Sequence, residues 1–281
     1  MRVLIIRSKW DLDPLPLDQF LTRIRQQGFD GSEIHLPSLH ESPETTIALH
    51  QENHLASVLM ITTEGKTPEE HLASLDQRYK QAIRYRPLHI NCHTGRDIFP
   101  LEDNVRIFRR GLALVEEHGV PLYHETHRGR ATFSLLSTLA ILQALPALKI
   151  TADFSHWCCV HESLLDDMQE GLDAAIRQTG YIHARVGHPE GPQVSDPRAP
   201  EWQHAVEAHL GWWERIAASA RARGSAQLAL CPEFGPPPYM PTLPYTQTAV
   251  ADVDEIIRHM MQLLRARLYT QTINRSNDLE A

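Results

Sequence analysis

The sequence predicts a (β/α)8 (TIM) barrel, and three observations lead to this fold class. Short apolar runs alternate with longer helical patterns along almost the whole chain. The length of 281 residues suits a barrel of typically about 250 residues. Carboxylates and imidazoles recur where the apolar runs end, as expected at the mouth of a barrel. A doubly wound parallel sheet is the competing architecture. Because we find no repeat or linker, we expect one domain over residues 1–281.

The predicted strands are short runs rich in apolar and β-branched residues, bounded by glycine, proline or polar residues. They are spaced widely enough for a return helix to follow each one. In chain order they are Val3–Ile6, Gly31–His35, Ala56–Thr62, Leu88–Cys92, Pro121–Glu125, Lys149–Phe154, Tyr181–Ala184 and Gln227–Cys231.

Helix boundaries are marked by capping residues. Thr67 and Glu70 form a capping-box pattern with Pro68 at the first helical position, and Ser42-Pro43 predicts a second helix start of the same kind. A glycine between a helical pattern and the next strand is typical of a helix end. Four positions fit this description: Gly28, Gly119, Gly180 and Gly224.

Two long loops follow the last two predicted strands. They cover Gly187–Trp202 and the proline-rich Pro232–Pro244. Proline fixes φ, so the second loop should be stiff. Since both loops begin next to candidate site residues, we expect them to act as lids.

Composition narrows the class of protein. The net charge of −8 argues against a nucleic-acid-binding protein, which usually carries a basic face. The four cysteines form no CxxC pair, which favours reduced thiols over a disulfide framework. The apolar core of the N-terminus is too short for a signal peptide, and no stretch is long enough to span a membrane. We therefore expect a soluble, cytoplasmic protein without a nucleic-acid or membrane partner.

Four strand ends predict a metal site. Glu125, Asp153, His183 and Glu233 are separated by 28, 30 and 50 residues, and a strand with its return helix takes about 30. Side chains at the carboxyl ends of barrel strands converge on one mouth. Three carboxylates and one imidazole suit a hard or borderline divalent ion. Mn²⁺ is favoured, with Mg²⁺, Co²⁺ or Zn²⁺ as alternatives.

Taken together, these motifs resemble the xylose isomerase-like TIM-barrel superfamily, which includes sugar and sugar-phosphate isomerases and epimerases as well as endonuclease IV, an AP endonuclease of family 2. The matching features span most of the chain. They are the segment Gly28–Ile34, the strand-end Glu125, Asp153 followed by His156, then His183 and Glu233. The resemblance implies that Glu125, Asp153, His183 and Glu233 are the metal ligands. It also implies that Glu125 and Glu233 are the catalytic acid/base pair.

Further polar residues near these strand ends are candidates for substrate binding. Arginine suits carboxylate or phosphate groups, so an anionic or heavily hydroxylated substrate is expected. For each residue the alternative is a structural hydrogen bond or a salt bridge at the barrel rim. The candidates are His93, His127, Arg128, His156, Arg185 and His188. Trp10, Phe99 and Trp157 could form an apolar wall or fill the barrel.

We therefore predict a metal-dependent isomerase or epimerase of a sugar or sugar acid, with a dehydratase or lyase as a close alternative. A DNA-repair phosphodiesterase resembling endonuclease IV would need additional ligands. The third strand ends at Thr62 without a histidine, and Arg198 stands where a further histidine is required. A single metal and a small polyhydroxylated substrate are expected instead. A non-catalytic barrel fits the intact ligand set poorly. A homodimer or homotetramer is possible.

Overall fold

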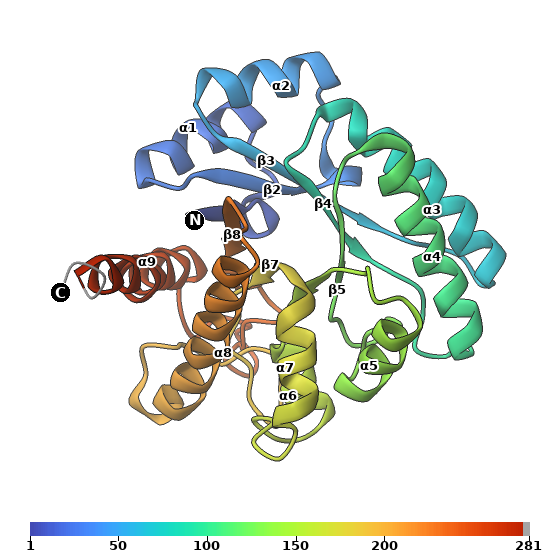
Figure 1. Ribbon diagram of the computed structural model, residues 1–281. Coiled ribbons are helices and arrows are strands. Elements are labelled where there is room, and N and C mark those ends of the chain that lie inside the picture. The colour runs from blue at the N-terminus through green and yellow to red at the C-terminus, as the bar shows by residue number, and fades with distance from the viewer. Residues whose placement is uncertain (278–281) are drawn as a thin grey trace.

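The strands form a closed parallel barrel. The structure is a computed structural model that describes residues 1–277, with side chains described as far as residue 268. Within this range each strand pairs in parallel with the next along the chain, and β8 closes the barrel against β1. Figure 1 shows the helices as a ring around the strands. Closure of the sheet confirms the predicted (β/α)8 barrel and excludes the doubly wound alternative.

Three strands have the predicted bounds, and the others differ at their ends. The main differences are that β6 ends before Asp153, and that β7 begins two residues earlier than predicted. The strands are β1 (Arg2–Ser8), β2 (Gly31–His35), β3 (Ala56–Thr62), β4 (His89–His93), β5 (Leu122–Glu125), β6 (Ile150–Ala152), β7 (Thr179–His183) and β8 (Gln227–Cys231).

The predicted helix starts are confirmed. The Thr67 side chain accepts from the Glu70 amide while Glu70 bonds back to the Thr67 amide, and Ser42 accepts from Thr45 at 3.2 Å. The α-helices are α1 (Leu17–Gln27), α2 (Pro43–Glu52), α3 (Pro68–Ala82), α4 (Leu101–His118), α5 (Leu135–Ala144), α6 (Ser155–Val160), α7 (Gln169–Gln178), α8 (Gln203–Ala222) and α9 (Val253–Asn277).

The predicted glycine helix ends are right at three positions and wrong at one. Gly28, Gly119 and Gly224 have positive φ at or just after a helix end. Gly180 lies inside β7, where the pairing with β6 shifts by one residue. A Cβ on Gly180 would lie 2.6 Å from the Tyr123 ring. Glycine is therefore required here by the close approach of an aromatic ring.

Apolar side chains fill the barrel interior below the site. One buried cluster inside the barrel contains Ile6, Val58, Tyr181 and Cys231, while a larger one packs the helices against the outside of the sheet. Because the inner cluster fills the interior, the barrel is not an open channel, and polar chemistry is confined to the carboxyl end of the barrel. No helix of the described residues is long and apolar enough to cross a membrane.

Candidate active site

The two-residue alternation of strands places the site residues inside the barrel mouth. Tyr181 and Cys231 belong to the buried inner cluster. His183 lies two residues after Tyr181 at the end of β7, and Glu233 lies two residues after Cys231, just beyond β8. Because successive side chains point to opposite faces, residues two apart share the inner face. Glu125 ends β5 in the same way, and Asp153 directly follows β6.

These four residues form a buried cluster. One ligand atom from each of Glu125, Asp153, His183 and Glu233 lies within 4.8 Å of the others. His183 Nδ1 is 3.0 Å from Glu233 Oε2 and 3.4 Å from Glu125 Oε2. All four side chains are buried. The sequence therefore correctly predicted which residues come together, although their role as ligands remains a proposal.

The donor atoms of this cluster fit a divalent metal ion. His183 Nδ1 and Glu233 Oε2 are both buried and make no hydrogen bond, although they are only 3.0 Å apart. Buried polar atoms are normally paired, so these two need either a proton on Nδ1 or a cation between them. A cation among three carboxylates and one imidazole would satisfy them, and this donor set suits a hard or borderline ion.

The cluster concentrates negative charge around one imidazole. Burial alone would raise the pKa of Glu125 and Glu233, but neighbouring imidazoles, and Arg185 in the case of Glu233, hold both below the usual range. Burial and the other carboxylates raise the pKa of Asp153 to about 6 in spite of the Arg185 guanidinium. Burial would lower the pKa of His183, but the surrounding carboxylates raise it well above the usual range. The site thus attracts a cation.

Neighbouring side chains hold the carboxylates in place. Asn91 Nδ2 donates to Glu125 Oε2 at 2.6 Å. Asp153 accepts from the Ser155 backbone amide at 3.2 Å and from the Ser155 hydroxyl, and it forms a close ion pair with Arg185. Asn91 was not identified from the sequence, although its inward position on β4 between His89 and His93 could have indicated it.

Glu33 also belongs to the site and was given no role by the sequence. It lies on β2, is buried, and places Oε2 3.1 Å from His183 Nε2. The signal that could have found it is a charged residue on the inner face near the end of a strand, between Gly31 and His35.

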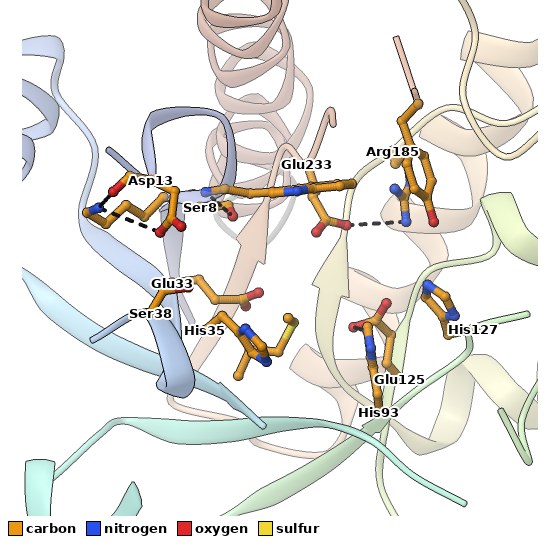
Figure 2. A pocket seen from close by; sticks show the side chains of 14 residues that line it. Ser8, Asp13, Glu33, His35, Ser38, His93, Glu125, His127, Arg185 and Glu233 are labelled. Carbon is orange, nitrogen blue, oxygen red and sulfur yellow. Dashed lines mark hydrogen bonds and ion pairs between the residues drawn. The ribbon is translucent and has the colours of Figure 1, made fainter. Parts of the chain in front are cut away.

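A cavity opens beside the cluster. It has about 740 Å³ of empty space, including its open mouth. Of the four cluster residues, Glu125 and Glu233 line it, whereas Asp153 and His183 do not. Figure 2 shows Asp13 and His35 on the side opposite Arg185 and His127. The remaining lining residues are Ser8, Lys9, Trp10, Glu33, Ser38, Met60, His93 and Tyr239.

Two of the predicted substrate-binding histidines line the cavity. His93 Nε2 lies 3.0 Å from Glu125 Oε2. The His127 ring lies between His93 and His156, with ring centroids 4.4 and 3.9 Å apart. Burial, with the nearby His93, lowers the pKa of His127 to about 3, so this ring is neutral. His93, Glu125 and His127 also bring ligand atoms within 4.8 Å, which makes a second candidate metal group.

The predicted arginines and the last histidine occupy different environments. Arg185 is buried, lines the cavity and lies over the Tyr239 ring at 4.9 Å. Arg128 is exposed and lies over the same ring at 5.2 Å. His188 packs its ring on Trp202 at 4.7 Å. Of the six predicted substrate-binding residues, Arg128, His156 and His188 do not line the cavity in the described part of the chain.

Aromatic residues cover part of the cavity. Trp10 lines it and packs edge-on against Tyr239 at 5.1 Å. A Cβ on Gly235 would lie 2.3 Å from the Trp10 ring, so glycine is needed there for Trp10 to pack. Phe99 and Trp157 were expected beside Trp10, but neither lines the cavity. Phe99 packs on His71, and Trp157, which belongs to α6, is buried and stacks on Phe154.

The two loops predicted to be lids are bonded to each other. Gly235 N donates to Gln193 Oε1 at 2.7 Å, and Gln193 Nε2 donates to Gly235 O at 3.1 Å. Val194 and Met240 are also buried. Both loops are therefore packed segments, and it is the second that lines the cavity, through Glu233 and Tyr239.

No protein-family model and no curated protein matches the chain. The fold matches solved structures across the xylose isomerase-like TIM-barrel superfamily. Apo 3-keto-D-glucoside 4-epimerase from E. coli has a TM-score of 0.64 at 16% identity, covering 94% of this chain and 100% of that one. D-Allulose 3-epimerase from Methylomonas sp. gives 0.62 at 16%, covering 95% and 98%. Endonuclease IV from Thermus thermophilus gives 0.59 at 15%, covering 96% and 100%.

Proposed function

We propose that the protein is a divalent-metal-dependent isomerase or epimerase of a sugar or sugar-acid-like substrate. The observation that carries this proposal is the buried cluster of Glu125, Asp153, His183 and Glu233 beside a polar cavity. The similarity of the fold to two sugar epimerases supports it as an analogy. Mn²⁺ is our first choice of ion, with Mg²⁺, Co²⁺ or Zn²⁺ as alternatives.

The four ligands divide into two pairs. Asp153 and His183 do not line the cavity and would only hold the ion, which when bound would polarise a substrate carbonyl. Glu125 and Glu233 line the cavity, so they can also reach a substrate proton. Their lowered pKa values keep both ionised at neutral pH, so each can accept a proton next to the carbonyl.

Substrate contacts come from other residues of the cavity. His93 and His127 lie beside Glu125 and present ring nitrogens to hydroxyl groups. Arg185 lies on the same side of the cavity as His127, and it is engaged with Asp153 and Glu233. This polar lining favours a small polyhydroxylated substrate.

Dehydration or lyase chemistry uses the same proton abstraction and is the alternative function. A probable 3-DHS dehydratase from Bacillus anthracis has a similar fold, with a TM-score of 0.60 at 15% identity over 94% of this chain and 98% of that one. DNA-repair phosphodiester cleavage is disfavoured. Asp196 forms a surface ion pair with Arg198 at 2.7 Å and belongs to neither candidate metal group of the described residues.

Metal analysis and deuterium exchange test the proposal. We expect one tightly bound divalent ion, lost in Asp153→Ala and His183→Ala; full occupancy in both variants would refute the ligand assignment. A screen of ketoses, keto-acids and inososes in D₂O should identify a substrate that takes up deuterium beside its carbonyl. Exchange should disappear in Glu233→Gln with metal retained, but persist in the control Glu190→Gln, which changes an exposed carboxylate. Wild-type turnover by Glu233→Gln would refute its acid/base role.

A further inference from the structure

We propose that Glu33 is a positioning residue of the metal centre: it accepts a hydrogen bond from His183 Nε2–H and so directs the Nδ1 lone pair into the cluster. The inference rests on the metal-binding part of the proposed function. It adds a residue from the far side of the barrel to a ligand set that comes from β5, β7 and the segments after β6 and β8.

The contacts of His183 Nε2 determine which ring nitrogen carries the proton. Nε2 is 3.1 Å from Glu33 Oε2 and 3.4 Å from Asn91 Nδ2. Asn91 Nδ2 already donates to Glu125 Oε2 at 2.6 Å. Rotating the Asn91 amide would place two acceptor oxygens against each other, so Nδ2 is the donor there. A carboxylate oxygen accepts, which leaves Glu33 as the acceptor for a proton on Nε2.

The other ring nitrogen lies at the centre of the cluster. With the proton on Nε2, a neutral ring presents an unprotonated Nδ1 to Glu233 Oε2 at 3.0 Å and to Glu125 Oε2 at 3.4 Å. Nδ1 makes no hydrogen bond and is buried. A lone pair between two carboxylates is unfavourable, so this place is taken by a proton on Nδ1 or, when the site is loaded, by a metal cation. A histidine that binds a metal through one nitrogen commonly donates its other N–H to a carboxylate.

Glu33 reaches His183 across the interior of the barrel. β2 and β7 are not neighbours in the sheet, and both residues are buried on its inner face. Figure 2 shows the Glu33 side chain extending from the Asp13 and His35 side of the cavity. Because the hydrogen bond comes from the opposite wall, it fixes the ring plane of His183 independently of the neighbouring strands.

Two substitutions separate the hydrogen bond from the charge of Glu33. Glu33→Gln keeps the shape and removes the charge, while Glu33→Asp keeps the charge and shortens the reach. Asp13→Asn is the matched control, because Asp13 lines the same cavity and interacts with Lys9. Affinity for Mn²⁺ is measured from the EPR signal of the free ion. Glu33→Asp should bind Mn²⁺ about 10–100-fold more weakly than wild type, because it cannot reach His183. Glu33→Gln should lose less, because its amide oxygen can still accept from Nε2–H, and Asp13→Asn should bind normally.

Wild-type affinity in both Glu33 variants, or an equal loss in Asp13→Asn, would overturn the positioning role and leave the proposed function intact. A raised KM with unchanged Mn²⁺ affinity would also overturn it, because Glu33 would then contact substrate only. If the wild-type protein itself binds no Mn²⁺, the proposed function fails as well.

A spectroscopic test needs no substitution of Glu33. Protein labelled with ¹⁵N-histidine and loaded with diamagnetic Zn²⁺ should show His183 with a protonated Nε2, coupled to its ring protons in long-range ¹H–¹⁵N spectra. The signal is assigned by its absence in His183→Asn. An unprotonated Nε2 on His183 in the loaded wild-type protein would refute the inference, even if the Glu33 variants failed to fold.

Discussion

Arg185 provides the sharpest test of the electrostatics of the site. Its guanidinium is buried, forms a close ion pair with Asp153 and lies 3.4 Å from Glu233 Oε2. Replacing Arg185 with Met keeps an apolar side chain over Tyr239 but leaves both carboxylates without their cation. We therefore expect the metal-free variant to be strongly destabilised.

The size of the effect follows from the burial of the pair. Removing one partner of a buried ion pair costs about 3–5 kcal/mol. Because the entropy of unfolding is about 2.1 cal/mol/K per residue, this corresponds in a chain of 281 residues to a Tm lowered by roughly 5–8 °C. Arg198→Met is the matched control: it removes a pair with Asp196 whose side chains are 37% and 23% exposed, and exposed pairs contribute about 0–1 kcal/mol.

Added metal should narrow the difference in Tm between Arg185→Met and wild type. A divalent ion in the cluster replaces part of the lost positive charge, and binding at 100 times Kd stabilises a protein by about 2.7 kcal/mol. Thermal unfolding is followed by circular dichroism in chelator and in excess Mn²⁺. Equal Tm losses for Arg185→Met and Arg198→Met in chelator would refute the buried-pair argument. If Mn²⁺ left the Tm difference between Arg185→Met and wild type unchanged, a bound divalent ion would not be replacing the charge of Arg185.

Two further predictions concern the scaffold. Gly180→Ala should destabilise the protein by about 1–3 kcal/mol, because the added Cβ meets the Tyr123 ring at 2.6 Å. Gly211→Ala, in α8 with no atom within 4 Å of the new Cβ, should stabilise it by up to about 1 kcal/mol. The urea midpoint of unfolding should be lower than that of wild type in Gly180→Ala and higher in Gly211→Ala. Shifts in the same direction would contradict this account. Burial lowers the pKa of His209 to about 4, and its Nε2 accepts from the Gly187 amide. Between pH 6.5 and 4 the unfolded chain therefore binds a proton on His209 that the folded chain does not bind. As the pH is lowered through this range, the free energy of unfolding should decrease by about 1.4 kcal/mol per pH unit. His209→Gln should show a shallower slope of urea midpoint against pH, and an unchanged slope would refute the assignment.

The barrel was predictable because most of its strands are short buried runs rich in apolar residues and several of its helices carry clear caps. Strand ends depend on the neighbouring strand, which a single sequence does not show. β6 is short because β5 ends at Glu125, which pairs with Thr151. Beyond that point the Thr126 hydroxyl, and not a strand backbone, bonds the backbone of Asp153. Gly180 was misplaced because a glycine at a helix end and one beneath an aromatic ring look alike in sequence.

The convergence of the four cluster residues Glu125, Asp153, His183 and Glu233 was predictable for a similar reason. These residues occupy successive strand ends, and convergence at the barrel mouth follows from topology alone. Glu33 was missed because its partner His183 lies across the barrel, and Asn91 because its partner Glu125 lies on the neighbouring strand β5. Sequence spacing does not encode these distances of 3.1 and 2.6 Å. His188 was expected near the substrate because it follows His183 by five residues, but the turn His188–Gly191 carries it onto Trp202.

Residues placed by strand topology were predictable and residues placed by loops were not, which explains why the sequence indicates a class of reaction but no substrate. The four cluster residues come from the second half of the barrel, where strand topology fixes them. Much of the facing wall comes from the loop after β1, with Lys9, Trp10 and Asp13, and from His35 at the end of β2. Lys9 is held there by the backbone oxygens of Leu12 and Asp13. A loop folded on such local bonds can change shape without moving the four cluster residues, so substrate identity must be sought in this wall.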